Sequence, residues 1–455
     1  MNLAIPERVE SFVGLFGTSL DKRKRVVFPL LLSCVLLCRG PKSYAGLART
    51  IVVQERNRSS LCRFFQRQRL RSRNIYEDAM DSVLEQYREH NKIIEPVVWF
   101  LAIDGVCSKR GGFAKIENTT KYRKKQKDKG TSTKAHTFIQ ALLITHTGLR
   151  IPLPRRTYYT RKYCWKRKRK YVKMTRLAAI IVETVKVPPM VSIVVVADEF
   201  FEGTLLDTAC NTRGFTYITP VDSRRCIANR NGERTGQTLF RHGKALDRKK
   251  LKKIVFTPYK ERTALLRRRT GGDKKRRVYF ATSEKLCISG LGERTVLFSW
   301  KPATKSRRWK SSWFKCLVSN AKTLDAATLI EYYELRWQIE IFFRELKSFI
   351  GLVDFTGENF EAYERFVDMV LLAYLFLEWY RFELLSSCSR RKDIPELQRA
   401  RTRSLLRLFQ SEADMSSVKY ITECGNNKAV MKELVASVNR LLGNKMHADK
   451  ALSVN

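Results

Sequence analysis

The segment Tyr333-Glu-Leu-Arg-Trp-Gln-Ile-Glu-Ile-Phe-Phe-Arg-Glu-Leu-Lys347 has apolar residues at helical spacing, and its polar residues form two stripes. One stripe contains four residues at separations of 3, 4 and 7: Tyr333, Arg336, Glu340 and Lys347. The other contains Glu334, Gln338 and Glu345. An ordinary surface helix with ion pairs needs only one polar stripe to face water. If one of the two stripes faces water, the other needs a different explanation, such as a binding or catalytic face.

Two aspartates come directly after apolar runs that predict buried strands. Asp104 follows the run 96–103, and Asp198 follows the run 191–197. Each has an ordinary alternative as a turn residue, because Asp-Gly is a common turn dipeptide. Asp198 also has two acidic competitors nearby, Glu199 and Glu202. Taken alone, neither aspartate identifies a catalytic site.

The order of the expected elements predicts an α/β fold. After the strand 96–103 we expect strands over 138–145 and 149–153, then a helix over 175–187. A strand over 191–197, a helix over 204–210 and a strand over 215–219 follow. This β-β-β-α-β-α-β order resembles an RNase H-like core, a mixed sheet flanked by helices. Many α/β proteins share parts of this order, so it is weak evidence alone.

The spacing Tyr-(2)-Arg-(3)-Glu-(6)-Lys resembles the signature of the DDE insertion-sequence transposases called YREK transposases, and all four positions match. That family has an Asp on the first core strand, an Asp on the fourth, and a long insertion before the Glu-bearing helix. Here the gaps are 198 − 104 = 94 and 340 − 198 = 142 residues, so the second is long enough for an insertion. The resemblance covers residues 43 to about 350. One departure is local: Gly105 and Val106 stand where many relatives have a second Asp or a Thr.

The resemblance implies five regions. We expect a helical DNA-binding region over 1–95, the first part of the RNase H-like core over 96–221, a β-rich insertion over 222–318, the Glu-bearing helix of the core over 319–355, and a helical C-terminal region over 356–455. Within the insertion, candidate strands are 254–259, 277–281, 285–289 and 295–300. Two short helices around 43–65 are compatible with a helix-turn-helix, and a basic helical bundle with solvated faces is the alternative. The last region is the candidate for dimerisation.

The resemblance also implies the catalytic residues and their cofactor. Asp104, Asp198 and Glu340 are expected to hold two Mg²⁺ ions, for which Mn²⁺ can substitute. Asp104 would bridge both ions, Asp198 would bind one and Glu340 the other. Carboxylates are the ligands that magnesium prefers, and an ion pair suits in-line phosphodiester cleavage. Tyr333, Arg336 and Lys347 are expected to hold phosphates at the transposon end.

Further DNA contacts are expected from aromatic and basic residues outside the signature. In relatives that form a DNA hairpin, a Trp in the insertion stabilises a flipped base. The candidate here is Trp313, its rivals are Trp300 and Trp309, and a core role is the alternative. Arg224 and Arg225, just past the last core strand, and the basic segment 155–173 are expected to contact phosphates.

The net charge favours nucleic acid as the partner. The 455 residues include 88 Lys and Arg against 44 Asp and Glu, and the basic residues are spread along most of the chain. A membrane partner is not expected, because the most apolar run, 26–38, is too short to span and contains Pro29. The 11 cysteines form no Cys-x-x-Cys pair and the 5 histidines no cluster, so we expect no zinc site. A reduced cytoplasmic protein, nucleoid-associated in a prokaryote, is the resulting prediction.

Three functions remain to be distinguished. The first is an active transposase that cleaves double-stranded DNA at terminal repeats and joins it to target DNA by cut-and-paste, with or without a hairpin intermediate, working as a homodimer in the synaptic complex. The second is a catalytically silent or domesticated DNA-binding protein. The third is an RNA-binding structural protein. The three acidic residues favour the first, since a pure binder has no use for them facing phosphate.

Overall fold

The computed structural model describes residues 5–17, 20–50, 58–66, 72–110, 116–123, 132–229, 231–246, 252–256, 277–300, 314–355, 357–388, 397 and 400–424. The chain forms two compact units. The helical unit comprises Met1–Asn91, Ser108–Ala135 and Arg344–Asn455. The sheet unit comprises Lys92–Cys107 and His136–Phe343.

Three parallel strands form the centre of the sheet unit. β1 (Val97–Arg110) pairs with β6 (Val191–Ala197), which pairs with β7 (Thr216–Val221). The strands are rich in valine and isoleucine and are buried, as expected for parallel strands covered on both faces. Their pairing ends with Ile103 opposite Ala197. The next residue on each strand is an aspartate, so the register brings Asp104 and Asp198 side by side.

β1 is longer than the sequence predicts. Asp104 was expected to follow the strand, but β1 continues to Arg110, so Asp104 lies inside it. Beyond Ile103 the pattern changes from continuously buried to alternating, with Val106 and Ser108 buried and Gly105 exposed. One face of the strand therefore stays in the core after the pairing with β6 has ended, which is why Asp-Gly does not form a turn here.

The remaining core strands lie on the other side of β1. β3 (Ser132–Ile144) is its neighbour, and β4 (Arg150–Pro152) and β5 (Arg156–Thr157) pair antiparallel with β3. In chain order the core strands are β1, β3, β4, β6 and β7. Across the sheet they lie in the order β4, β3, β1, β6 and β7, which fits an RNase H-like core. Helix α7 (Met174–Thr184) comes just before β6 in the chain, and α8 (Thr204–Thr212) lies between β6 and β7. The two helices pack against each other.

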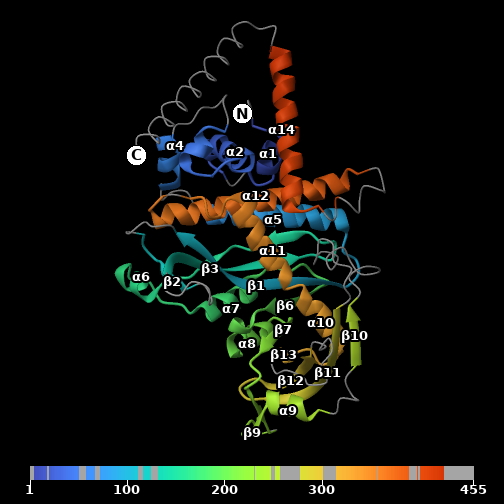
Figure 1. Ribbon diagram of the computed structural model, residues 1–455. Coiled ribbons are helices and arrows are strands. Elements are labelled where there is room, and N and C mark those ends of the chain that lie inside the picture. The colour runs from blue at the N-terminus through green and yellow to red at the C-terminus, as the bar shows by residue number, and fades with distance from the viewer. Residues whose placement is uncertain are drawn as a thin grey trace. The chain divides into compact units, whose positions relative to one another are not determined.

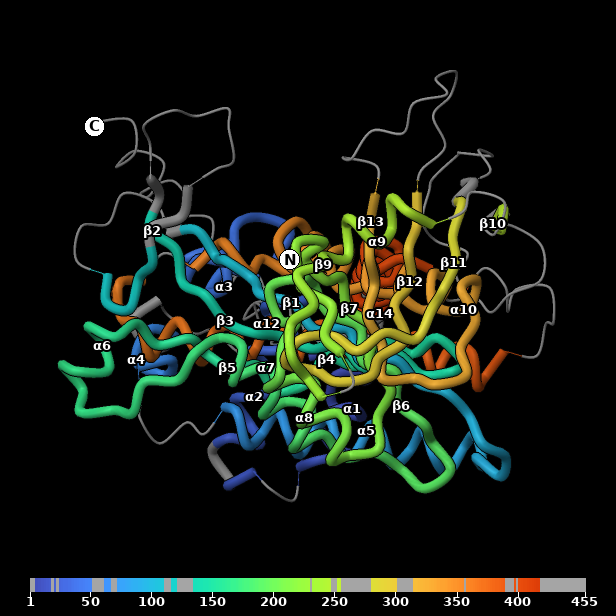
Figure 2. The backbone as a smooth tube through the Cα atoms, turned by 90° about the horizontal axis from the view of Figure 1, so that it is seen from below, coloured from blue at the N-terminus to red at the C-terminus, as the bar shows by residue number. Residues whose placement is uncertain are grey.

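The sheet continues into the region expected to be a β-rich insertion. β13 (Phe314–Ser319) pairs with β7, followed in order by β12 (Gly292–Trp300) and β11 (Arg277–Ile288), all antiparallel (Figure 2). The two strands expected over 277–281 and 285–289 are one strand, β11. Four elements of this region were not expected: β13, the two strands of the hairpin β8 (Cys226–Ala228) and β9 (Arg234–Thr238), and α9 (Leu239–Ala245). β10 (Lys252–Phe256) pairs with β11.

The helical unit is organised around α12 (Phe360–Ser386), whose residues from 366 to 382 are all buried. Helix α5 (Ser72–Asn91) packs against α12, as do α1 (Glu7–Gly14), α2 (Lys22–Leu37), α4 (Arg58–Gln66) and α14 (Thr402–Cys424) (Figure 1). α3 (Tyr44–Ala48) contacts α4, and β2 (Thr120–Arg123) pairs with the start of β3. Among the described residues, no helix is both long and apolar enough to cross a membrane.

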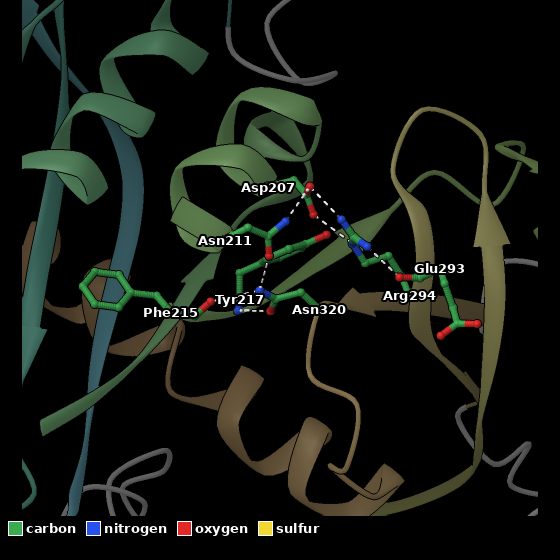
Figure 3. A network of polar contacts seen from close by, with 7 residues as sticks. All are labelled: Asp207, Asn211, Phe215, Tyr217, Glu293, Arg294 and Asn320. Atoms are coloured by element: carbon green, nitrogen blue, oxygen red, sulfur yellow. Dashed lines mark hydrogen bonds and ion pairs between the residues drawn. The ribbon is translucent and has the colours of Figure 1, made fainter. Parts of the chain in front are cut away.

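A polar network joins the core of the sheet unit to β12 (Figure 3). The guanidinium of Arg294 on β12 donates to both carboxylate oxygens of Asp207 on α8, at 2.9 and 2.7 Å. Asn211 donates to the same carboxylate and accepts from Asn320, which in turn accepts from the Tyr217 amide. Both charged side chains are mostly buried, so each depends on the other for compensation.

We predict that Arg294→Met lowers the free energy of unfolding by about 3–5 kcal/mol, because Asp207 is then left buried without its partner. The double variant Asp207→Leu/Arg294→Met removes both charges and should recover most of that loss. Urea unfolding of the three proteins at one ionic strength measures the difference. Equal stability of the single variant and the wild type would show that the pair does not hold β12 to α8.

Candidate active site

Each of the two aspartate side chains accepts a hydrogen bond from the backbone amide of the next residue. Asp104 Oδ1 accepts a hydrogen bond from the Gly105 amide at 2.7 Å. Asp198 Oδ1 accepts from the Glu199 amide at 2.9 Å and so caps the 3-10 turn Glu199–Phe201. In each case the second carboxylate oxygen is left for other partners. The register of β1 and β6 therefore produces a pair of carboxylates at one edge of the parallel strands.

The third carboxylate comes from a helix that the sequence predicts as continuous but that is interrupted. α10 (Ala326–Glu334) ends before Leu335, and α11 (Trp337–Glu345) begins two residues later. Tight i to i−3 hydrogen bonds cross the break, from the Leu335 amide to Tyr332 and from the Arg336 amide to Tyr333. The prediction of one helix through Tyr333–Lys347 is wrong here, because hydrophobic spacing does not distinguish a 3-10 step from an α-helical one.

Arg336, at that break, connects the carboxylates. Its Nη2 lies 2.6 Å from Glu340 Oε1, and its Nη1 lies 4.0 Å from Asp104 Oδ2. Burial lowers the pKa of the guanidinium, but Tyr333, Glu340 and Asp198 outweigh it and hold the pKa above its ordinary value. The Arg336 guanidinium also lies 5.7 Å from the centre of the Tyr333 ring. Three of the four signature residues thus meet at the two aspartates.

The electrostatics of the site reflect crowded negative charge. Burial raises the pKa of Asp104 to about 6, with Asp198 and Glu340 adding to the rise, while the Gly105 amide and Arg336 act in the opposite direction. Burial also raises the pKa of the Tyr333 hydroxyl to about 12, and the nearby Asp198 contributes. The side chains of Asp104, Asp198 and Glu340 therefore share one electrostatic environment, although they lie 94 and 142 residues apart in the chain.

A family model for the transposase DDE domain matches residues 99–376, more than half of the chain. The chain belongs to the DDE transposases. The match begins at β1 and ends within α12, so it includes both aspartates and the helix of Glu340. No curated protein matches the chain. The resemblance to a DDE transposase is thereby confirmed at the level of the family, as is its assignment as a transposase enzyme.

Lys347 is in the helical unit, in the π-helical turn Leu346–Ile350 that follows α11. Trp313 and Trp309 fall outside the described residues. Trp300 is buried and packs against Phe314, with ring centres 5.0 Å apart, as expected for a core residue.

The two arginines after the last core strand are both engaged within the protein. Exposed Arg224 pairs with Asp222 at 2.6 Å, and half-buried Arg225 pairs with Glu202 and donates to the Ser289 carbonyl. The pairing of Glu202 with Arg225 also removes it as a competitor of Asp198, and the side chain of Glu199 is exposed. The sequence reasoning assigned Arg336 to phosphate binding and missed its contacts with the carboxylates. Its i,i+4 spacing to Glu340 was the available signal.

We predict that Asp104→Asn stabilises the metal-free transposase at neutral pH. The folded pKa of about 6 lies above the ordinary value of 3.8. Ionised Asp104 therefore reduces stability fully above pH 6, and this penalty disappears as the pH falls toward 4. In EDTA at pH 7.5 the variant should be more stable by about 1–3 kcal/mol, and the two proteins should converge near pH 4. A variant less stable than the wild type at pH 7.5 would contradict the assigned crowding of charge.

Proposed function

We propose that this transposase cleaves and joins DNA phosphodiesters using Asp104, Asp198 and Glu340 as its catalytic carboxylates, and that it is of the YREK type. The observation that carries the proposal is the single guanidinium, Arg336, which lies against Glu340 and near Asp104 and interacts electrostatically with Asp198. Three acidic side chains brought together from distant parts of a chain are costly unless a cation compensates them. A cation site is the chemical use of such an arrangement.

The donor set suits Mg²⁺. Among the described residues no three acidic, histidine or cysteine side chains stand close enough to hold an ion as they are placed. The ligands are nevertheless the hard carboxylate oxygens that magnesium prefers, and burial, together with the smaller effect of the neighbouring carboxylates, raises the pKa of Asp104. A pair of divalent ions supplies charge stabilisation to the attacking and leaving oxygens of phosphodiester cleavage. Asp104, Asp198 and Glu340 would hold these ions, and Mn²⁺ would substitute for Mg²⁺.

The protein's own residues position the DNA in this proposal. Arg336 makes two contacts with carboxylates, and once those charges are compensated its fork can hold a phosphate in two places at once. Tyr333, whose raised pKa keeps it protonated, donates a hydrogen bond to phosphate rather than adding negative charge. Lys347 and the flipped-base role of Trp313 remain part of the proposal.

The proposal extends to the whole reaction. The substrate is double-stranded DNA at the transposon ends and at the target, processed by cut-and-paste, with a hairpin as one route of excision. The N-terminal helices bind end DNA, and the C-terminal helices, including α12 and α14, join two protomers in the synaptic complex. The region 222–318 is the insertion, and its strands β11 to β13 extend the core sheet in the structure.

We predict that Asp104→Asn, Asp198→Asn and Glu340→Gln each reduce cleavage by at least about a hundredfold while binding to the same DNA is kept. Glu199→Gln is the matched control, because this exposed carboxylate adjoins Asp198. The assay incubates each protein with Mg²⁺ and the DNA that flanks its own coding region and resolves nicks, hairpins and joined products on denaturing gels. EDTA should abolish all products. Normal cleavage by the three variants would assign the catalysis elsewhere, and binding without cleavage by the wild type would favour a silent DNA-binding protein.

We also predict that Arg336→Met makes stability depend more strongly on Mg²⁺. Without the guanidinium the carboxylates have no compensating charge, so the metal-free variant should be less stable than the wild type. Added Mg²⁺ should then stabilise the variant by on the order of 1–4 kcal/mol more than it stabilises the wild type. Thermal unfolding with Mg²⁺ or EDTA measures this, with Arg344→Met, an exposed arginine of the adjoining helix α11, as control. Equal Mg²⁺ responses of Arg336→Met and the wild type would contradict a shared site.

A further inference from the structure

The segment Arg155–Lys173, here called the basic knob, lies in the sheet unit between β5 and α7 and contains the short helix α6 (Arg161–Lys166) (Figure 1). It has ten basic residues and no acidic one. Eight of the basic side chains are exposed: Arg161, Lys162, Lys166, Arg167, Lys168, Arg169, Lys170 and Lys173. Such a density of like charge repels itself and is stabilised by a polyanion.

The basic knob has a defined internal structure. Its small core consists of Tyr163 and Cys164, both buried. The Thr160 side chain caps α6, and the Arg169 amide donates back to the Cys164 carbonyl at 2.8 Å across Lys168, which has a positive φ. This is a tight helix C-terminus of the kind that left-handed residues permit. The two ends of the knob are connected by the hydroxyls of Tyr158 and Tyr171, 3.2 Å apart. The charged surface is therefore built on a folded platform.

The tyrosine rings of the knob are engaged within it. Tyr159 stacks on Tyr163, with ring centres 5.6 Å apart and planes 13° from parallel. Arginines lie over the rings: Arg169 over Tyr159, Arg167 over Tyr163 and Arg161 over Tyr171, at 5.0 to 5.8 Å. These cation–π contacts orient the guanidinium groups and cover ring faces that would otherwise be available to a ligand.

Trp165 differs from these tyrosines. It lies on α6 next to Lys166 and is 85% exposed, the highest exposure among the large hydrophobic side chains described as exposed. Its carbonyl accepts from the Lys168 amide at 3.3 Å, whereas its indole makes no hydrogen bond or ring contact with the part of the chain that the structure describes. The lysines and arginines around Trp165 are the side chains that bind phosphates, so the indole is not needed for that purpose. Its flat face is suited to stacking on a nucleobase, and such stacking is tolerant of sequence.

We propose that the basic knob is a DNA-binding surface on which Trp165 stacks against an unpaired base while the surrounding lysines and arginines hold the adjoining phosphates. In an intact duplex both faces of each base are covered by its neighbours. A base with a free face occurs at a nick, a bulge or a frayed end, which are the structures that strand cleavage produces. The ligand is therefore distorted or partly single-stranded DNA. This inference rests on the proposed DNA function but not on the three carboxylates.

The test compares two DNA ligands in EDTA, a fully paired duplex and the same duplex with one unpaired 2-aminopurine. The wild type should bind the second more tightly and quench its fluorescence. Trp165→Ala should lose about tenfold in affinity for the unpaired-base DNA and relieve the quenching, with little change for the duplex. Trp165→Phe, which keeps a ring but no N–H, should retain part of both effects. Lys168→Ala/Lys170→Ala should weaken both ligands alike and reduce the salt slope by about 2.

Met190→Ala, a half-exposed apolar residue just before β6 in the same unit, is the control and should match the wild type. Equal affinity of Trp165→Ala and the wild type for both DNAs would overturn the proposal. So would the same loss in Trp165→Phe and Trp165→Ala, which would make the indole N–H a phosphate donor. Tighter binding of wild type than Trp165→Ala to phosphatidylserine vesicles, with no difference on DNA, would make the knob a membrane surface. Because no cleavage is measured, failure of the catalytic proposal would leave these results unchanged.

Discussion

The active site depends on keeping three carboxylates, Asp104, Asp198 and Glu340, near one another against their mutual repulsion. Asp104 and Asp198 are adjacent because their strands are parallel and in register, and Glu340 is added from α11. Burial, with a smaller contribution from the two like charges, raises the pKa of Asp104 to about 6. The guanidinium of Arg336 partly compensates the negative charge of Asp104 and Glu340. A folded protein keeps such a cluster only where the surrounding packing imposes it.

That packing comes from elements far from the carboxylates in sequence. The pairing of β13 with β7 extends the core sheet into the region before α10, so the Glu-bearing helix begins from a strand of the same sheet. Tyr332 of α10 then packs its ring edge-on against Phe100 of β1, with centres 5.0 Å apart. The ion pair of Asp207 and Arg294 holds β12 to α8. The position of Glu340 is thus determined by strand pairing and aromatic packing together.

The sequence predicted the parts of this site that depend on local spacing. Periodicity predicted two apolar strands next to Asp104 and Asp198, and the family resemblance placed those strands in one core; the structure contains both strands, paired in parallel. The i,i+4 spacing of Arg336 and Glu340 was present in the sequence, but their contact was not predicted from it. The sequence could not predict features decided by tertiary contacts. The extension of β1 beyond Asp104 depends on burial of Val106 and Ser108, and the break at Leu335 depends on a 3-10 step with the same hydrophobic spacing as a helix. β13 was missed because a run of six residues is short, although Phe314, Leu317 and Val318 are typical of a buried strand.

The distribution of charge gives the basic residues different roles. Arg294 forms an ion pair with buried Asp207, and Arg225 forms one with Glu202. Neither arginine therefore offers its full charge to a ligand. In the basic knob, by contrast, the arginines lie over tyrosine rings, which orient a guanidinium without neutralising it. Its positive charge therefore remains for an outside anion. Arg336 differs from both groups. It pairs with acids, as Arg294 does, but a divalent cation can also compensate those acids and so leave the guanidinium available to a ligand. A chain with 88 basic residues thus presents DNA with only some of them, and the neighbours of each arginine decide which.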